Sequence, residues 1–135
     1  MGSRGKPYRT VLVLGFEVLA GRGSVENDHL TFAVAEADDV WLHVAGGTPG
    51  SHVVIRNPQK APVPRAVIEQ AAAIAAWYSK ERDAASVVVH FCRAAHVKKP
   101  RGAPAGLVEM SRHESVRVKP GLPPSSPGRE DEREA

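Results

Sequence analysis

Residues 39–56 read DVWLHVAGGTPGSHVVIR, and this stretch predicts a β-hairpin. Apolar and other side chains alternate on both sides of a Gly/Pro-rich centre, which is typical of two strands joined by a turn. We expect the strands over 40–45 and 51–56, connected by residues 46–50. The period of two gives the first strand two faces, with Val40, Leu42 and Val44 on one and Trp41 and His43 on the other. Polar and aromatic side chains beside such a turn are typical of a binding surface.

The flanking sequence predicts further strands and a first helix. Short β-branched and apolar runs indicate strands over 10–14, 16–20, 86–92, 106–110 and 115–119, the last two forming a closing pair. Gly15 divides the first run from the second, as a bend or as a turn between two strands. Ser24 is suited to cap the first helix, which we expect to end near Asp38 with Leu30, Val34 and Phe32 on its inner side.

A second helix is the clearest element of the sequence. Pro62 and Pro64 precede or open it, and Lys80 and Arg82 lie at the end that favours cations. Its apolar side chains recur at helical spacing: Val67, Ala71, Ile74 and Tyr78. Strands and helices in this order predict an α+β domain, in which two main helices pack on a mostly antiparallel sheet.

The chain of 135 residues is long enough for one hydrophobic core and too short for two. We place a single domain at residues 10–119. Residues 1–9 are small, basic and rich in glycine, and residues 120–135 are rich in Pro, Ser and Glu. Neither end has enough apolar side chains to bury, so both are expected to be disordered.

Charge is unevenly distributed along the chain, although the formal net charge is only +3. Residues 11–55 carry one Arg against six acidic residues, whereas residues 93–119 carry seven basic residues against two acidic ones. A basic segment of this density attracts polyanions. The alternative is a set of solvated charges that keep strand edges from associating, and charge alone does not decide between the two.

The sequence has few signals for membrane insertion, secretion or redox chemistry. No run approaches the roughly 18 apolar residues that span a bilayer, and residues 1–7 lack the apolar segment of a signal peptide, so a cytoplasmic protein with no membrane partner is expected. The single Cys92 ends a Val-rich run, where a packed thiol is favoured over a nucleophile.

Catalytic interpretations fit the sequence poorly. Ser51, His43, His52 and Asp39 are the residue types of a hydrolase, but neighbours in a strand point to opposite faces, which separates Ser51 from His52. His90, Cys92 and His96, or His43 with His52, lack the spacing of a preformed metal site. The Gly21-Arg22-Gly23 turn has Glu26 where a dinucleotide loop needs its third glycine. We expect no enzyme activity, no metal and no cofactor.

Five blocks of sequence carry a resemblance. They are GR at 21–22 with ENDHLT at 26–31, DVWLHV at 39–44, PGSHVVIR at 49–56, AAWYSKER at 75–82 and HVKKPRGAPAG at 96–106. In this order they resemble the NFACT-R domain, the RNA-binding module at the carboxyl end of ribosome-associated quality control proteins. Some of those proteins are labelled fibronectin-binding proteins. Their other domains have no room in this chain, so we expect a free-standing module.

The resemblance implies a non-catalytic RNA-binding module in translation or ribosome-associated quality control. Transfer RNA or ribosomal RNA is the implied ligand, the large ribosomal subunit is a candidate partner, and DNA is not excluded. The alternative is a protein-interaction module that docks on a ribosomal or quality-control partner through the same surface.

Residue chemistry suggests how such a surface binds RNA. Lys98, Lys99 and Arg101 lie in a Gly/Pro-rich loop that suits phosphate contacts, the alternative being a solvated loop. Trp41 either stacks on an unpaired base or packs under a helix, and packing is favoured. Two further sets complete the predicted site. Hydrogen bonds to phosphate or the 2′-hydroxyl are expected from His43, Ser51, His52 and Arg56, and turns are expected at Pro49, Gly50, Gly102 and Gly106.

Overall fold

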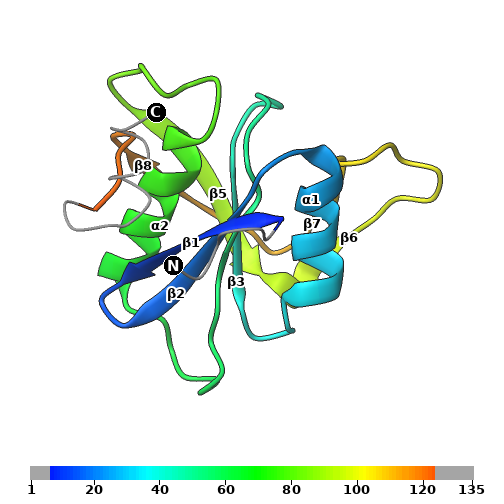
Figure 1. Cartoon of the computed structure of the whole chain (residues 1–135), viewed down its shortest axis with the longest axis horizontal. Helices are drawn as coiled ribbons and strands as arrows, with labels where there is room; N and C mark the ends of the chain where they lie inside the picture. Colours follow the sequence, from blue (N-terminus) through cyan, green and yellow to red (C-terminus); the bar gives the residue numbers. More distant parts are fainter. Residues whose placement is uncertain (1–6, 124–135) are drawn as a thin grey trace.

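A six-stranded sheet, antiparallel throughout, forms the centre of the computed structural model, which describes residues 7–123 (Figure 1). Its strand order is β1-β2-β4-β3-β5-β8. The strands are β1 (Tyr8–Val13), β2 (Phe16–Gly21), β4 (Val53–Ile55), β3 (Val40–Val44), β5 (Val87–Arg93) and β8 (Glu114–Val118). The helices and the sheet confirm the expected α+β class.

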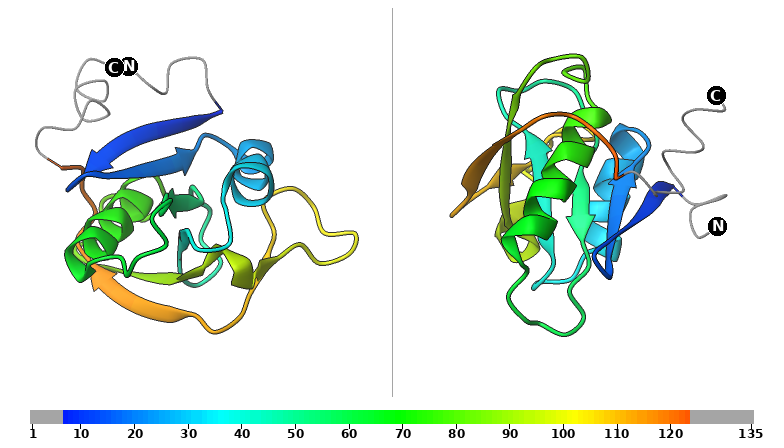
Figure 2. Two further views of the ribbon diagram at one scale, coloured as in Figure 1. Left: turned by 90° about the horizontal axis from the view of Figure 1, so that it is seen from below. Right: turned by 90° about the vertical axis from the view of Figure 1, so that its left-hand side faces the viewer.

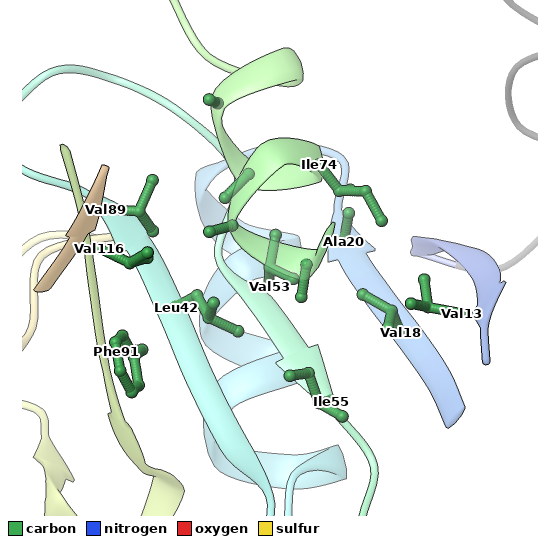
Figure 3. Close-up of a cluster of buried hydrophobic side chains, with 14 of the residues drawn as sticks. Val13, Val18, Ala20, Leu42, Val53, Ile55, Ile74, Val89, Phe91 and Val116 are labelled. Carbon is green, nitrogen blue, oxygen red and sulfur yellow. The ribbon is translucent and has the colours of Figure 1, made fainter. Parts of the chain in front are cut away.

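The two faces of the sheet bury separate groups of side chains. Helix α2 (Arg65–Trp77) packs on one face, which includes Leu42 and Val53 (Figure 3). Helix α1 (Ser24–His29) and the π-helical turn η1 (Leu30–Val34) cover the other face. Leu30, Trp41, Val54 and Cys92 are buried there. Alternation along β3 therefore places Trp41 and Leu42 in different parts of the core, as the period of two predicted.

The predicted hairpin is present, with a shorter second strand. Strand β3 pairs with β4 so that Trp41 lies opposite Val54. The predicted start of that strand at residue 51 is wrong: β4 begins at Val53, and the Ser51 amide donates to the Tyr78 carbonyl in the segment after α2. The sequence left open whether Gly15 bends one strand or forms a turn between two. Leu14 and Gly15, with φ of 49° and 88°, form a turn between the two strands β1 and β2.

Helix α2 ends earlier than predicted. The expected end at Lys80 and Arg82 is wrong, since the helix stops at Trp77 and Tyr78 has a φ of −94° and a ψ of 41°. Backbone groups beyond this point pair with the loop before β4, where the Lys80 amide donates to the Pro49 carbonyl over 3.1 Å. The end of α2 is therefore set by this tertiary hydrogen bonding, which local helix propensity cannot predict.

The first helical segment is also shorter than expected. Its N-cap is Gly23, not Ser24, and the chain becomes extended at Ala35. The Glu36 amide donates to the Asp39 carboxylate at 2.9 Å, which turns the chain into β3 before the predicted end at Asp38. Phe32, expected on the inner side, is 43% exposed.

The last two predicted strands do not pair with each other. Strand β7 (Glu109–Met110) pairs with β6 (Val97–Lys98), which follows a 3-10 turn over Ala94–His96. Strand β8 instead pairs with the edge of the main sheet at β5. Arg112, with a φ of 51°, lies between β7 and β8, where the chain turns away from one partner and toward the other.

Most of the two ends expected to be disordered, residues 1–6 and 124–135, lies outside the described residues. Tyr8 and Arg9, however, belong to β1, and Leu122 is buried against the core around α2. The ordered domain therefore extends beyond residues 10–119 in both directions. Within residues 7–123, no helix has the length and apolar character that a membrane crossing requires.

Candidate nucleic-acid interface

A groove of about 990 Å³ is the larger of two hollows described on the surface. Four segments that are distant in sequence form most of its lining: residues 22–27, 47–52, 77–82 and 104–108. The hairpin loop lies against the end of α2, and the loop after β6 lies beside α1 (Figures 1 and 2). Together with Trp41 and His43, these segments give the groove lining residues from all five blocks that carry the resemblance.

A hydrogen-bonded triad of side chains supports the floor of this groove, which Trp41 and His52 line and beneath which Thr31 is buried. The Trp41 indole N–H donates to the Thr31 hydroxyl over 3.1 Å, and that hydroxyl lies 2.9 Å from His52 Nδ1. Because an indole can only donate, Thr31 accepts from Trp41 and can give its own proton to a neutral His52. Trp41 is only 1% exposed. Of the two expected roles, packing under a helix is therefore the one that its burial fits, and the ring leaves no exposed face for a base.

Burial keeps the two histidines of the groove neutral. It lowers the pKa of His52 to about 4, an effect reinforced by His43 and opposed by the Gly106 backbone and Asp28. Burial also lowers the pKa of His43. The two rings are 5.2 Å apart, edge to face. Two imidazoles at this separation are poor sites for positive charge, so at neutral pH they supply neutral hydrogen-bonding groups.

Asn27 holds the hairpin loop against α1. Its amide oxygen accepts from the His52 N–H at 3.1 Å, and its amide nitrogen donates to the Gly50 carbonyl at 3.3 Å. Gly21 permits this arrangement, because a Cβ at that position would lie 1.9 Å from the Asn27 side-chain oxygen. Ser51 donates to the Gly21 carbonyl over 2.6 Å. Ser51 and His52 therefore have different partners, unlike the nucleophile and base of a hydrolase.

Gly50 and Gly106 have distinct steric roles. A Cβ on Gly50 would lie 2.7 Å from the Ser79 Cβ, so this glycine allows the loop to approach the segment after α2. The positive φ values of the loop occur instead at Gly46 and Gly47. Gly106 has a φ of 86° and lies close to Ser24, and Gly102 has a φ of 76°.

The predicted site residues fall into three places. Trp41, His43, Ser51 and His52 line the groove together with Pro49, Gly50 and Gly106. Lys99, Arg101 and Gly102 belong to the protruding loop beside it. Lys98, predicted in that loop, is instead the last residue of β6 and pairs with Glu109. Lys98 and Arg101 are exposed. Arg56 follows β4, at the opposite end of that strand from Ser51. It forms a 2.7 Å ion pair with the buried Asp39 and lines a separate hollow of about 240 Å³.

The groove also has four basic side chains that the sequence analysis did not assign to the site. They form the basic rim, which comprises Arg9, Arg22, Lys80 and Arg82. Among the described residues that line the groove, none is Asp or Glu. Counting charge along segments could not find this rim, because its members come from β1, from the turn between β2 and α1, and from the segment after α2. The blocks at 21–22 and 75–82 contain three of them, Arg22, Lys80 and Arg82, and were the available signal.

Two members of the basic rim stack on aromatic rings. The Arg82 guanidinium lies 4.3 Å from the Trp77 ring centroid and donates to the Trp77 carbonyl over 2.8 Å. The Arg9 guanidinium lies 4.3 Å from the centroid of Tyr78. Stacking of this kind holds a guanidinium in place and preserves its charge. The rim is thus partly ordered before any ligand arrives.

The fold and the groove define a single α+β domain with a basic, concave surface. The chain belongs to the NFACT protein RNA binding domain family, whose model matches residues 6–111. It is 42% identical over 120 residues to the Rqc2 homolog RqcH of Bacillus subtilis (strain 168), covering 85% of this chain and 20% of that protein. It is 36% identical over 118 residues to the RqcH of Streptococcus suis (strain 05ZYH33), covering 87% and 21%.

A solved structure agrees with this assignment. The C-terminal part of the fibronectin/fibrinogen-binding protein from Streptococcus suis superposes with a TM-score of 0.79 at 32% identity, covering 86% of this chain and 46% of that one. The chain spans about a fifth of the length of the curated relatives it matches. Among residues 7–123, no three His, Cys, Asp or Glu side chains are grouped as metal ligands.

Proposed function

We propose that this domain binds RNA along the groove, with the basic rim holding the phosphate backbone. Family membership supports RNA as the ligand. The observation that carries the proposal is the convergence of four basic side chains on one hollow without an acidic lining residue among those described. Phosphate contacts of this kind position a nucleic acid and give little information on sequence.

Transfer RNA or ribosomal RNA is the RNA class we propose, in a role within ribosome-associated quality control. The likeness to RqcH proteins supports this role. A groove that is open and lined by neutral histidines suits an irregular or single-stranded segment, whose 2′-hydroxyls and base edges are accessible. Contact with the large ribosomal subunit and a cytoplasmic location remain predictions.

Binding of RNA as a function of salt tests the proposal. We expect the affinity for a labelled transfer RNA, measured by fluorescence anisotropy, to fall steeply between about 50 and 200 mM salt. The variant Lys80→Ala should reduce the slope of log K against log salt by about 0.7–0.9, as one lost phosphate contact does.

A matched control separates the groove from net charge. Arg65 lies at the far end of α2, 58% exposed, and does not line the groove. Arg65→Ala removes the same charge and should leave the slope unchanged. RNA binding that is absent or insensitive to salt would reject the proposal and favour the protein-interaction alternative.

A further inference from the structure

Lys99 has every donor of its ammonium group occupied within the protein. Its Nζ lies 2.9 Å from Asp28 Oδ2, donates to the Leu107 carbonyl over 3.0 Å, and donates to the Pro104 carbonyl. An ammonium has three N–H groups, so these contacts use all of them. The Lys99 and Asp28 side chains are only 29% and 25% exposed. Lys98, its neighbour, is exposed, and its side chain forms no hydrogen bond or ion pair with residues 7–123.

Asp28 fastens the same loop from the side of α1. Its Oδ1 accepts the Gly106 N–H at 3.0 Å while Oδ2 binds Lys99. Gly106 also packs closely on α1, since a Cβ there would lie 3.1 Å from the Ser24 Cβ. Asp28 and Lys99 therefore clamp the two ends of the loop 99–107 to each other and to the helix.

This loop forms one wall of the groove. Residues 104–108 line the groove, and the Gly106 backbone is close enough to His52 to favour its protonated form. Between β6 and β7 the chain has no regular secondary structure, and it protrudes beyond α1 (Figure 2). A loop of this kind is mobile unless it is fastened, and ordering it during binding would weaken affinity.

We propose that Lys99 is a positioning residue: with Asp28 it holds the loop 99–107 as a wall of the groove, and it does not itself contact phosphate. The proposal rests on RNA binding in the groove for its effect on affinity. The role of Lys99 in holding the loop does not depend on RNA. An unpaired Asp28 carboxylate would add a second effect, because a bare negative charge beside the groove repels phosphate.

A double-mutant cycle between Asp28 and Lys99 tests this role. The variants are Lys99→Met, Asp28→Asn and both together, with Lys98→Met as the matched control of equal charge. We expect Lys99→Met to weaken RNA binding about fivefold and to have a much smaller effect in the Asp28→Asn background. In the Asp28→Asn background, where no carboxylate is left bare, Lys99→Met should leave the slope of affinity against salt unchanged, because no phosphate contact is lost.

A direct phosphate contact predicts other results. Lys99→Met would then weaken binding equally in both backgrounds and would reduce the salt slope by about 0.7–0.9, which would overturn the proposal. Lys98→Met should leave the clamp intact, and any change it makes in affinity should be the same with and without the Asp28→Asn substitution.

Hydrogen–deuterium exchange gives a readout that needs no RNA. In the full chain, the amides of residues 102–108 should exchange about tenfold faster in Lys99→Met than in Lys98→Met. Unchanged exchange would overturn the clamp even if RNA binds. Faster exchange without any RNA binding by the parent chain would uphold the clamp and reject the proposed function instead.

Discussion

Thr31 is the residue on which the floor of the groove depends. Its hydroxyl is shared between the Trp41 indole and His52 Nδ1, both of them buried. A polar atom that is buried without a partner loses its hydration without compensation. The three side chains therefore require one another, although they come from η1, β3 and the loop before β4.

The substitution Thr31→Val should destabilise the domain by about 1–3 kcal/mol, because it keeps the shape of the side chain and leaves two buried nitrogens unpaired. Urea unfolding measures this change. Thr48 is the control, since its hydroxyl donates to Glu81 over 3.2 Å at a half-buried site. Thr48→Val should change the free energy of unfolding by less than about 1 kcal/mol, and an equal loss in both variants would contradict the role of Thr31.

His52 should make stability depend on pH. Its pKa in the folded chain is about 4, below the ordinary 6.5, so the unfolded chain binds the proton more readily. The stabilisation is complete above pH 6.5 and is lost as the pH falls from 6.5 toward 4, by about 3 kcal/mol in total. Carboxylates titrate in the same pH range, so the contribution of His52 must be isolated by comparing the pH dependence of stability between variants.

Urea unfolding at pH 7.5 and pH 4.5 measures how much stability each variant loses between the two pH values. We expect the loss of stability between the two pH values to be smaller in His52→Gln than in the parent chain. His29→Gln, on the exposed side of α1, should retain the full loss. The same pH dependence in all three proteins would show that His52 does not contribute.

The two ends of β4 have different tasks. At the groove end, the chain before Val53 bonds to the segment after α2. At the other end, Asp39 accepts the amides of Asn57 and Glu36, at 2.7 and 2.9 Å, and binds Arg56. Asp39 is 1% exposed and its charge needs these partners. This end stabilises the fold, and the groove end lines the candidate site.

Arg56 should therefore matter for stability and not for RNA. We expect Arg56→Ala to lower the free energy of unfolding by about 1–3 kcal/mol, because it leaves the Asp39 carboxylate short of its cation. The RNA affinity of the folded variant should stay within about twofold. Arg65→Ala, which breaks an exposed pair with Glu69, should lower stability by less than about 1 kcal/mol. An Arg56 variant of normal stability with weakened RNA binding would restore Arg56 to the predicted site.

Hydrophobic periodicity predicted the strands and helix α2 better than capping residues predicted the ends of the helices. The alternation of residues 40–44 placed Trp41 and Leu42 on the correct faces, and the Ala-rich spacing located α2. The ends of the helices were missed because tertiary hydrogen bonds set them, as between Pro49 and Lys80. The partners of β7 and β8 were missed because pairing depends on which edges the rest of the sheet leaves free.

Across the whole molecule, charges that are segregated in the sequence partly neutralise one another in the fold. Lys99 of the basic segment binds Asp28 of the acidic one, and Arg93 likewise binds Asp38. The basic rim is instead assembled from scattered residues. The hairpin part of the candidate site was thus accessible from sequence, through Trp41, His43, Ser51 and His52. The rim was not, because only the fold brings Arg9 and Lys80 to the same groove.

The most direct test of RNA binding in the groove is a nuclear magnetic resonance titration of the ¹⁵N-labelled chain with a short single-stranded RNA. We expect saturable shifts of backbone signals in residues 47–52, 77–82 and 104–108, and unchanged signals around Arg56 and residues 57–60. Shifts that gather around Arg56, or that are absent at RNA concentrations where anisotropy reports binding, would contradict the assignment of the groove as the RNA site.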